Sequence, residues 1–225
     1  MDKFPTTILW AWERPERLKF IDPRLTGVAF LARTLNLRGD EVVIRPRLQP
    51  LDVAPDTSLI AVARIETDAK KRPTFSSQQL EASVSAIAGL GQLPKLRAVQ
   101  IDFDALSTER EFYRRLLTEV RRTLPANLPL SITALASWCM HDRWLANLPV
   151  DEAVPMLFRM GIGQRQVSNY LNTHVGFNPD ICRKSAGISI DEAPPRLPAR
   201  RRTYVFNPQP WNLQSVEHAL QEASK

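Results

Sequence analysis

Short alternating or apolar segments recur along the whole chain, and several are separated by stretches in which apolar residues recur every three or four positions. The first kind of pattern is typical of strands and the second of helices. We predict eight strands, at residues 6–12, 41–51, 58–67, 97–105, 130–137, 153–161, 186–193 and 203–208.

Helical spacing predicts five helices, at residues 22–39, 76–91, 107–124, 163–174 and 212–223. The first ends in Gly39, which is typical of a helix C-cap, and the second begins at a serine cap. The third has the clearest pattern, with Ser107 as its N-cap and Glu109 and Glu111 near the positive end of the helix dipole.

Strands that alternate with helices indicate an α/β fold, and eight of them predict a compact (β/α)8 barrel. No linker or change of composition divides the chain, so we expect one domain over residues 1–225. The alternative is an open doubly wound sheet. That fold would favour a glycine-rich phosphate loop after the first strand, where the chain has ERPERL instead. Nucleotide binding by such a loop is not expected, and no cofactor is predicted.

Two acidic residues lie close together in the strand at residues 97–105. Side chains alternate along a strand, so Val99 and Ile101 should face the helices while Asp102 and Asp104 face the barrel axis. The chemistry of such barrels lies at the carboxyl ends of the strands. Two like charges there would raise one pKa, which suits a general acid.

Other charged residues are predicted near the same end of the barrel. Candidates for a second carboxylate are Glu13, Glu66 and Asp191, and candidates for contacts to an anionic ligand are Arg45, Arg64 and Arg159. A purely structural interpretation remains open for some of them. Arg64 would then pair with Asp102 across neighbouring strands, and Glu66 would pair with Arg45.

Three tryptophans, Trp12, Trp138 and Trp211, follow strand ends, where an exposed indole could stack on a sugar ring. Each could equally be a core residue. The histidines His141, His174 and His218 are not at metal-ligand spacing, so no metal site is predicted.

The net charge is +6, but basic residues are scattered and their only dense run is Arg200–Arg202. Such a run is typical of a solvated loop, so no nucleic-acid partner is expected. No stretch of 18 apolar residues predicts a membrane span. Cys139 and Cys182 could form one disulfide or remain two thiols, and the oligomeric state is open.

The chain also resembles a known family. The strings VQIDFDALSTEREFYRRLL and LSITALASWCMHDRWLANLPVDEAVPMLFRMG, with WAWERPE and GISIDEAP, are similar to the bacterial domain of unknown function 3142. More remotely, QIDFD is similar to the D-x-x-D-x-D-x-E pattern of family 18 chitinases. Aligning its middle acids on Asp102 and Asp104 puts Val99 and Leu106 at its ends. Aligning its last two acids there instead puts Arg97 and Gln100 at the others. The glutamate of the pattern is absent in both alignments.

These features predict a glycoside-hydrolase-like barrel that acts on a polysaccharide, which the arginines suggest is anionic or acetylated. Asp104 would donate the proton and Asp102 would orient it. A non-catalytic carbohydrate-binding barrel and a protein that binds through its basic surface are the alternatives. The resemblance implies a bacterial envelope protein. The first strand begins about five residues from Met1, so we expect that an export signal has been removed and that the protein is periplasmic or membrane-anchored.

Overall fold

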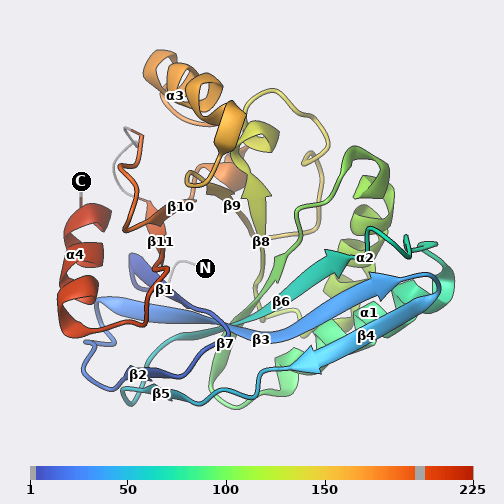
Figure 1. Cartoon of the computed structure of the whole chain (residues 1–225), viewed down its shortest axis with the longest axis horizontal. Helices are drawn as coiled ribbons and strands as arrows, with labels where there is room; N and C mark the ends of the chain where they lie inside the picture. Colours follow the sequence, from blue (N-terminus) through green and yellow to red (C-terminus); the bar gives the residue numbers. More distant parts are fainter. Residues whose placement is uncertain (1–3, 196–200, 225) are drawn as a thin grey trace.

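The computed structural model describes residues 4–195 and 201–224 (Figure 1). Within them, eight parallel strands form a closed barrel, which confirms the predicted fold class. In barrel order the strands are β1 (Thr7–Ala11), β3 (Thr26–Arg38), β6 (Leu59–Thr67), β7 (Leu96–Asp102), β8 (Leu130–Leu135), β9 (Glu152–Met156), β10 (Ser185–Ser189) and β11 (Arg202–Phe206), which pairs with β1. Met1 and Arg200, on which two of the expectations above partly rest, lie outside the described residues.

Four helices occur where helical spacing predicts them. They are α1 (Ser77–Ala88), α2 (Arg110–Thr123), α3 (Gln164–Thr173) and α4 (Leu213–Ala223). The hydroxyl of Ser76 caps α1 by accepting from the backbone N–H of Gln79 at 3.3 Å. Ser107 is not the cap of α2, because it lies in a 3-10 turn whose preceding residue, Leu106, donates its N–H to the Glu109 carboxylate at 2.8 Å.

The predicted helix at residues 22–39 is wrong, because this segment forms the long barrel strand β3. Its pairing with β6 shifts register between Leu31 and Arg33, so the strand contains a bulge at Ala32. Because of this extra residue, the apolar side chains at 28 and 35 lie on the same face of the strand although they are seven residues apart. The apolar residues at 28, 31, 32 and 35 therefore have the spacing of a helix, although the segment is a strand.

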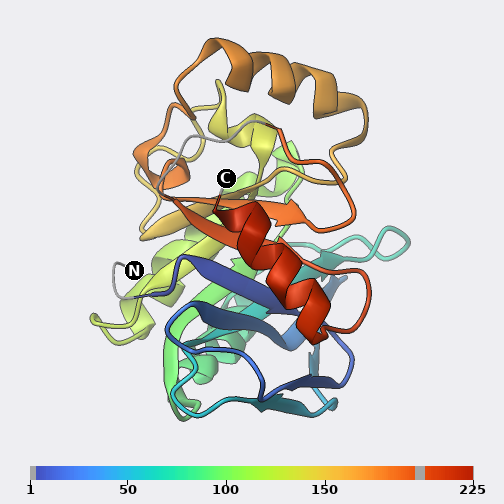
Figure 2. The ribbon, with the colours of Figure 1, turned by 90° about the vertical axis from the view of Figure 1, so that its left-hand side faces the viewer.

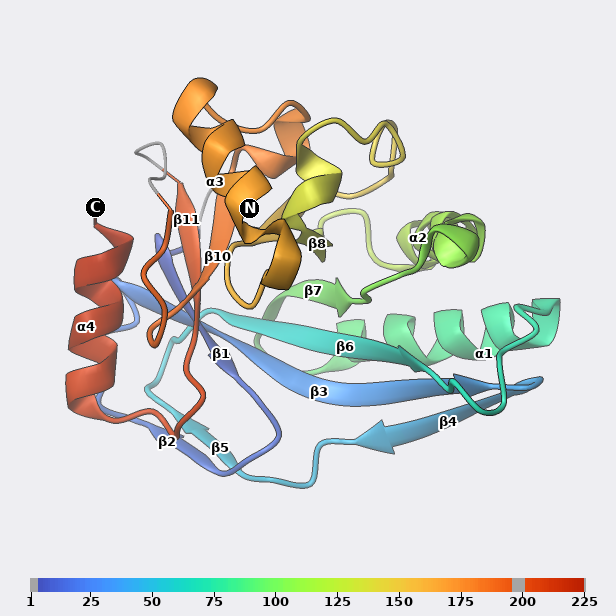
Figure 3. The same ribbon diagram turned by 45° about the horizontal axis from the view of Figure 1, so that its top comes forward.

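Gly39 belongs to a hairpin turn and not to a helix end. It has a positive φ of 48° and connects β3 to β4 (Glu41–Pro46), which pairs antiparallel with β3. The predicted barrel strand at 41–51 is therefore wrong as a barrel strand. Figure 3 shows the β3–β4 hairpin extending beyond the barrel alongside α1.

The chain between β1 and β6 contains no helix. Instead, β2 (Glu16–Leu18) pairs with β5 (Leu51–Val53) in a small parallel sheet. Buried residues of this region, such as Leu18, pack with Leu9 of β1, Val28 of β3 and Val216 of α4. Figure 2 shows α4 lying across this side of the barrel. None of the described helices is long and apolar enough to cross a membrane.

The faces of β7 lie as predicted. Val99 and Ile101 belong to the large core between the strands and the helices. Gln100 points into the barrel, where it bonds to Trp10 and Ser131. The barrel interior is filled by a separate cluster that includes Ile60, Val62 and Tyr204. The base of the barrel is thus a packed core, and open space begins only above it.

Gly187 leaves room for an indole inside the barrel. A Cβ on this residue would lie 2.9 Å from Cη2 of Trp10. We expect Gly187→Ala to lower the free energy of unfolding by about 1–3 kcal/mol, as overpacking of a core does. Chemical denaturation followed by tryptophan fluorescence measures this. Gly163→Ala is the control, because a Cβ there meets no atom within 4 Å. Equal stability of the two variants would contradict the fixed position of Trp10.

Candidate active site

A cavity of about 390 Å³ opens at the carboxyl ends of the barrel strands. Its walls are largely aromatic. Phe158 and Phe206 are stacked with their ring centroids 5.5 Å apart, Trp10 lies 6.1 Å from Phe158, and Trp12 meets Phe206 edge-on at 6.4 Å. The volume lies within the range of about 300–1,000 Å³ that is usual for ligand sites.

Asp102, at the end of β7, is a buried carboxylate on the cavity wall, with 6% of its surface exposed. Its Oδ1 accepts from the hydroxyl of Thr133 at 2.7 Å, and its Oδ2 lies 3.2 Å from Nη1 of Arg64. Burial raises the pKa of Asp102, while Arg64 and the Thr133 hydrogen bond act in the opposite direction. These two contacts fix the carboxylate in one orientation.

Asp104 lines the same cavity two residues further on, just past the end of the strand. No described residue forms a hydrogen bond or ion pair with its carboxyl group. Although Asp104 is exposed as a residue, partial burial of its carboxyl group raises its pKa, the charge of Asp102 raises it further, and Arg64 partly opposes both. Asp104 is therefore an uncommitted carboxyl group that holds its proton more strongly than a free aspartate.

Arg64 connects the cavity to a network of ion pairs at its rim. Besides Asp102, it contacts Glu66 at 3.0 Å, and Glu66 lies 3.6 Å from Arg45. The guanidinium of Arg64 also lies over the ring of Trp12, 5.6 Å from the centroid. The Arg64–Asp102 and Arg45–Glu66 ion pairs, which the purely structural interpretation of the sequence predicts, therefore both form. Glu66 and Arg45 do not line the cavity.

Trp12 is held in place by an arginine that the sequence pattern did not single out. Arg47 donates to the carbonyl oxygens of Ala11, Trp12 and Arg14, the last at 2.6 Å, just after β1 ends. Burial lowers the pKa of Arg47. The strand pattern places Arg47 on the same face as Arg45, but only the path of the chain after β1 gives it three carbonyl acceptors.

Arg159 also lines the cavity, beside two acidic residues of the loop after β10. Its guanidinium lies over Phe206 at 4.9 Å, and its Nη2 is 4.0 Å from Oδ2 of Asp191. Asp191 itself accepts a hydrogen bond from Ser189 and does not line the cavity. The backbone N–H of Arg159 donates to both carboxylate oxygens of Glu192.

Three other candidates lie away from the cavity. Trp138 is 3% exposed and packs edge-on against Trp144 in the main core. Trp211 is 5% exposed, packs beneath α4 and donates Nε1–H to the carbonyl of Trp10. Neither ring offers an open face to a sugar. Glu13 is exposed and is not among the cavity residues.

Sequence patterns did not identify Phe158, Phe206 and Met156, which also line the cavity. Met156 ends β9, Phe158 lies just beyond that end, and Phe206 ends β11. Their position at strand ends could have indicated that they line the cavity, but in the sequence they cannot be told apart from ordinary apolar strand residues. No group of three or more His, Cys, Asp or Glu side chains in the described ranges is arranged to hold a metal ion.

A buried polar chain supports the cavity floor from below. Trp10 donates Nε1–H to Gln100 at 2.9 Å, and Gln100 donates to the hydroxyl of Ser131 at 3.1 Å. Ser131 donates to Glu152, which also accepts from Tyr204 at 2.8 Å. Because each of these buried polar groups has a partner, the chain fixes the orientation of the Trp10 indole at little cost in desolvation.

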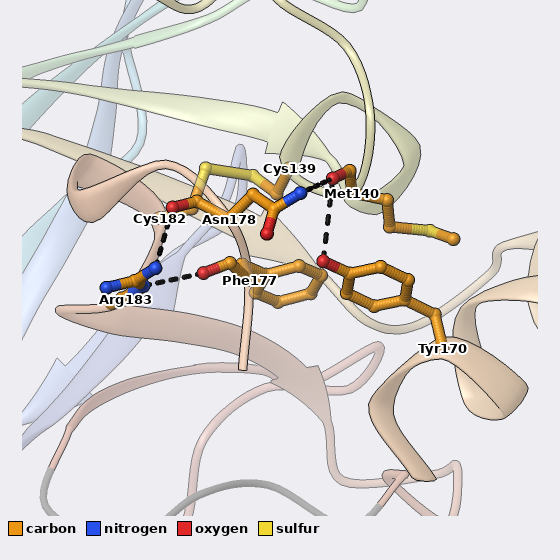
Figure 4. The surroundings of a disulfide bond; sticks show 7 residues. All are labelled: Cys139, Met140, Tyr170, Phe177, Asn178, Cys182 and Arg183. Carbon is orange, nitrogen blue, oxygen red and sulfur yellow. Dashed lines mark hydrogen bonds between the residues drawn. A yellow bond between two sulfur atoms is a disulfide. The ribbon is translucent and has the colours of Figure 1, made fainter. Parts of the chain in front are cut away.

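A disulfide joins the turn after β8, which lines the cavity through Ala136 and Ser137, to the loop before β10 (Figure 4). Cys139, in the turn after β8, bonds to Cys182, just before β10, with their Cα atoms 6.0 Å apart. Around it, Asn178 donates to the carbonyl of Met140 at 2.7 Å, and Tyr170 of α3 donates to the same oxygen at 3.5 Å. The disulfide therefore holds the β8 loop beside the segment that follows α3.

Residues 57–156 match the family model described as "Domain of unknown function (DUF3142)". This confirms the resemblance noted from the sequence over that segment. No curated protein matches the chain.

The solved structures that are similar to this chain include two spore proteins. The Bacillus cereus spore cortex-lytic enzyme SleL is 17% identical, with a TM-score of 0.50 over 82% of this chain and 50% of SleL. The chitinase domain of the spore coat protein CotE from Clostridium difficile is 12% identical, with a TM-score of 0.46 over 99% of this chain and 63% of that one. The chain thus spans only half of SleL, and the likeness to SleL shows the barrel fold alone.

Proposed function

We propose that this protein is a glycoside-hydrolase-like barrel that cleaves a polysaccharide, with Asp104 as the proton donor. One observation carries the proposal. An uncommitted carboxyl group with a raised pKa stands in an aromatic-walled cavity, next to a second carboxylate that is held rigidly. Proton donation to a departing sugar oxygen requires a group of this kind.

The two aspartates differ in role because their surroundings differ. Asp104 has no competing partner among the described residues, so its proton is available to the oxygen of the bond that breaks. Asp102 is bonded to Thr133 and Arg64, so it stays in place, and its charge helps Asp104 keep the proton until the reaction. Asp102 is thus assigned as the orienting group.

We infer that the nucleophile is not a side chain of this protein. Among the described residues, Asp102 and Asp104 are the only carboxylates that line it, while Glu13, Glu66 and Asp191 do not. Water, or a neighbouring group of the substrate itself, would attack the anomeric carbon. The bond to the leaving oxygen then breaks as that oxygen takes the proton from Asp104. Water supplies the new hydroxyl group at the anomeric carbon, and the other proton of that water returns to the Asp104 carboxylate, directly or through solvent, which restores the acid.

The aromatic walls suit a carbohydrate. Sugar rings present flat faces of C–H groups, and the rings of Trp12 and Phe206 border the cavity. SleL, whose name describes it as a lytic enzyme of the spore cortex, shares the barrel fold and agrees with the proposal. The cavity residues support the proposal independently of that likeness.

A second candidate function is a carbohydrate-binding barrel without activity. It is favoured by the absence of the glutamate of the chitinase-type pattern, whose place is taken by Asp104 in one alignment and by Leu106 in the other. Aspartate is shorter by one methylene group and reaches less far into the cavity. The aromatic walls would still bind sugar in that case.

Incubating the purified protein with a panel of oligosaccharides separates the two functions. We expect mass spectrometry to detect shorter products and calorimetry to detect binding of at least one glycan. Binding without products would establish the second candidate. If neither binding nor products are found for any glycan, the carbohydrate hypothesis is wrong.

Trp12→Ala tests the aromatic wall. We expect about tenfold weaker glycan binding, equivalent to about 1.4 kcal/mol, because a stacking surface is removed. The free energy of unfolding should fall by about 1–2 kcal/mol, since the indole is only half-buried and packs at the edge of the cluster inside the barrel, against Arg64 and Phe206. Calorimetry and thermal unfolding measure the two effects. Phe20→Ala, an exposed aromatic outside the cavity, is the matched control. Equal binding by both variants would contradict the assignment.

We also propose that the protein works outside the cytoplasm. The disulfide supports this, because such bonds persist mainly in oxidising compartments. Fractionation of cells that express the full gene tests it. Protein found wholly in the cytosol with free thiols would show that the proposal is wrong.

A further inference from the structure

Two arginines line the cavity, and their surroundings differ. Arg64 is committed to Asp102, Glu66 and the ring of Trp12. Arg159 has only one acidic partner within ion-pair distance among the described residues, Asp191 at the 4.0 Å limit, and its side chain is 56% exposed. Its guanidinium is therefore the cavity cation with the most hydrogen-bonding capacity left.

The backbone at Arg159 is unusual as well. Its φ is 52°, in the left-handed region that glycine adopts without cost and other residues rarely do. Glu192 holds this turn by accepting the Arg159 N–H with both carboxylate oxygens, at 3.0 and 3.2 Å. Strained residues cluster at ligand sites, where the side chain has a use that glycine could not serve.

Phe206 holds the guanidinium over the cavity wall. The Cζ atom lies 4.9 Å from the ring centroid, and among the described residues no side-chain N–H of Arg159 forms a hydrogen bond, the nearest acidic oxygen being that of Asp191 at 4.0 Å. An arginine fork matches a carboxylate in a bidentate arrangement.

We propose that the glycan bound in this cavity is acidic, and that Arg159 binds the carboxylate of a sugar next to the cleaved bond. This inference rests on the proposed function, and it names the class of substrate. The charges of the cavity agree with it. Asp102 is matched by Arg64. Among the described residues, the guanidinium of Arg159 has only the distant and exposed Asp191 within ion-pair distance, because the Glu192 carboxylate is engaged by the Arg159 backbone N–H, and a ligand carboxylate can replace Asp191.

The test uses the Asp104→Asn variant, which should bind substrate without cleaving it. Calorimetry compares tetrasaccharides of hyaluronan and of polygalacturonate with the same tetrasaccharides after reduction of their carboxylates to alcohols. We expect at least one acidic form to bind about tenfold more tightly than its reduced form. Adding Arg159→Gln should abolish that preference and leave the affinity for the reduced form unchanged.

Arg165→Gln, added to the same variant, is the matched control. Arg165 is an exposed residue of α3 that does not line the cavity, so this change removes the same charge without touching the site. It should retain the preference. Equal affinity for acidic and reduced glycans, or equal losses in the two arginine variants, would overturn the inference while leaving the proposed function standing. If the protein binds no glycan of any kind, the proposed function fails together with the inference.

Discussion

Asp104→Asn is expected to lower the rate of glycan cleavage by about 10²–10⁴-fold, the contribution that a general acid typically makes. Asparagine has nearly the same shape but no proton to donate. Because no described residue depends on the Asp104 carboxyl for a hydrogen bond, stability and glycan binding should remain close to those of the unaltered protein. Turnover of an oligosaccharide, calorimetry and thermal unfolding measure the three quantities.

The pH profile gives an independent check of the same role. A raised pKa keeps Asp104 protonated to a higher pH than an ordinary aspartate, and activity should then be lost as the pH rises through that pKa. Asp52→Asn is the control, because Asp52 lies on β5, pairs with Lys19 and is outside the cavity. If Asp104→Asn retains most of the activity, or loses no more than the control, Asp104 is not the proton donor.

Removal of the disulfide by Cys139→Ala together with Cys182→Ala is expected to lower the free energy of unfolding by about 4 kcal/mol. The bond closes a loop over a sequence separation of 43 residues, and the restriction it places on the unfolded chain grows with loop length. Chemical denaturation measures the change. Because Ala136, Ser137 and Val167 line the cavity on this side, glycan binding should weaken as well.

Chemical reduction supplies the matched comparison for this variant. The unaltered protein in reductant should lose nearly the same stability, whereas the double variant should not respond to reductant. A double variant as stable as the unaltered protein would show that Tyr170, Asn178 and Arg183, which bond to the loops around the disulfide, suffice to hold them together.

The placement of the two aspartates could be predicted from the sequence because strand periodicity is local. Once residues 97–105 are recognised as a strand, alternation puts Asp102 on the inner face with Gln100, and the structure has both there. The same reasoning failed for Trp138 and Trp211. The loops after β8 and β11 turn their indoles back into the core, and no local pattern reports the direction of a loop.

By itself, the sequence determined the barrel, most of its strands, four of its helices and the pair of acids at its mouth, because all of these follow from short-range periodicity. Only the tertiary structure decided three other features. Residues 26–38 became a strand because β1 and β6 supply hydrogen-bonding partners on both sides and a bulge absorbs the helical spacing. Cys139 and Cys182 became a disulfide because the barrel brings their Cα atoms to 6.0 Å. Among the described residues, Asp104 and not Asp102 is left without a hydrogen-bond or ion-pair partner, because Thr133 and Arg64, from the two strands that flank β7, both contact Asp102. Each of these depends on contacts between distant parts of the chain, which no local pattern contains.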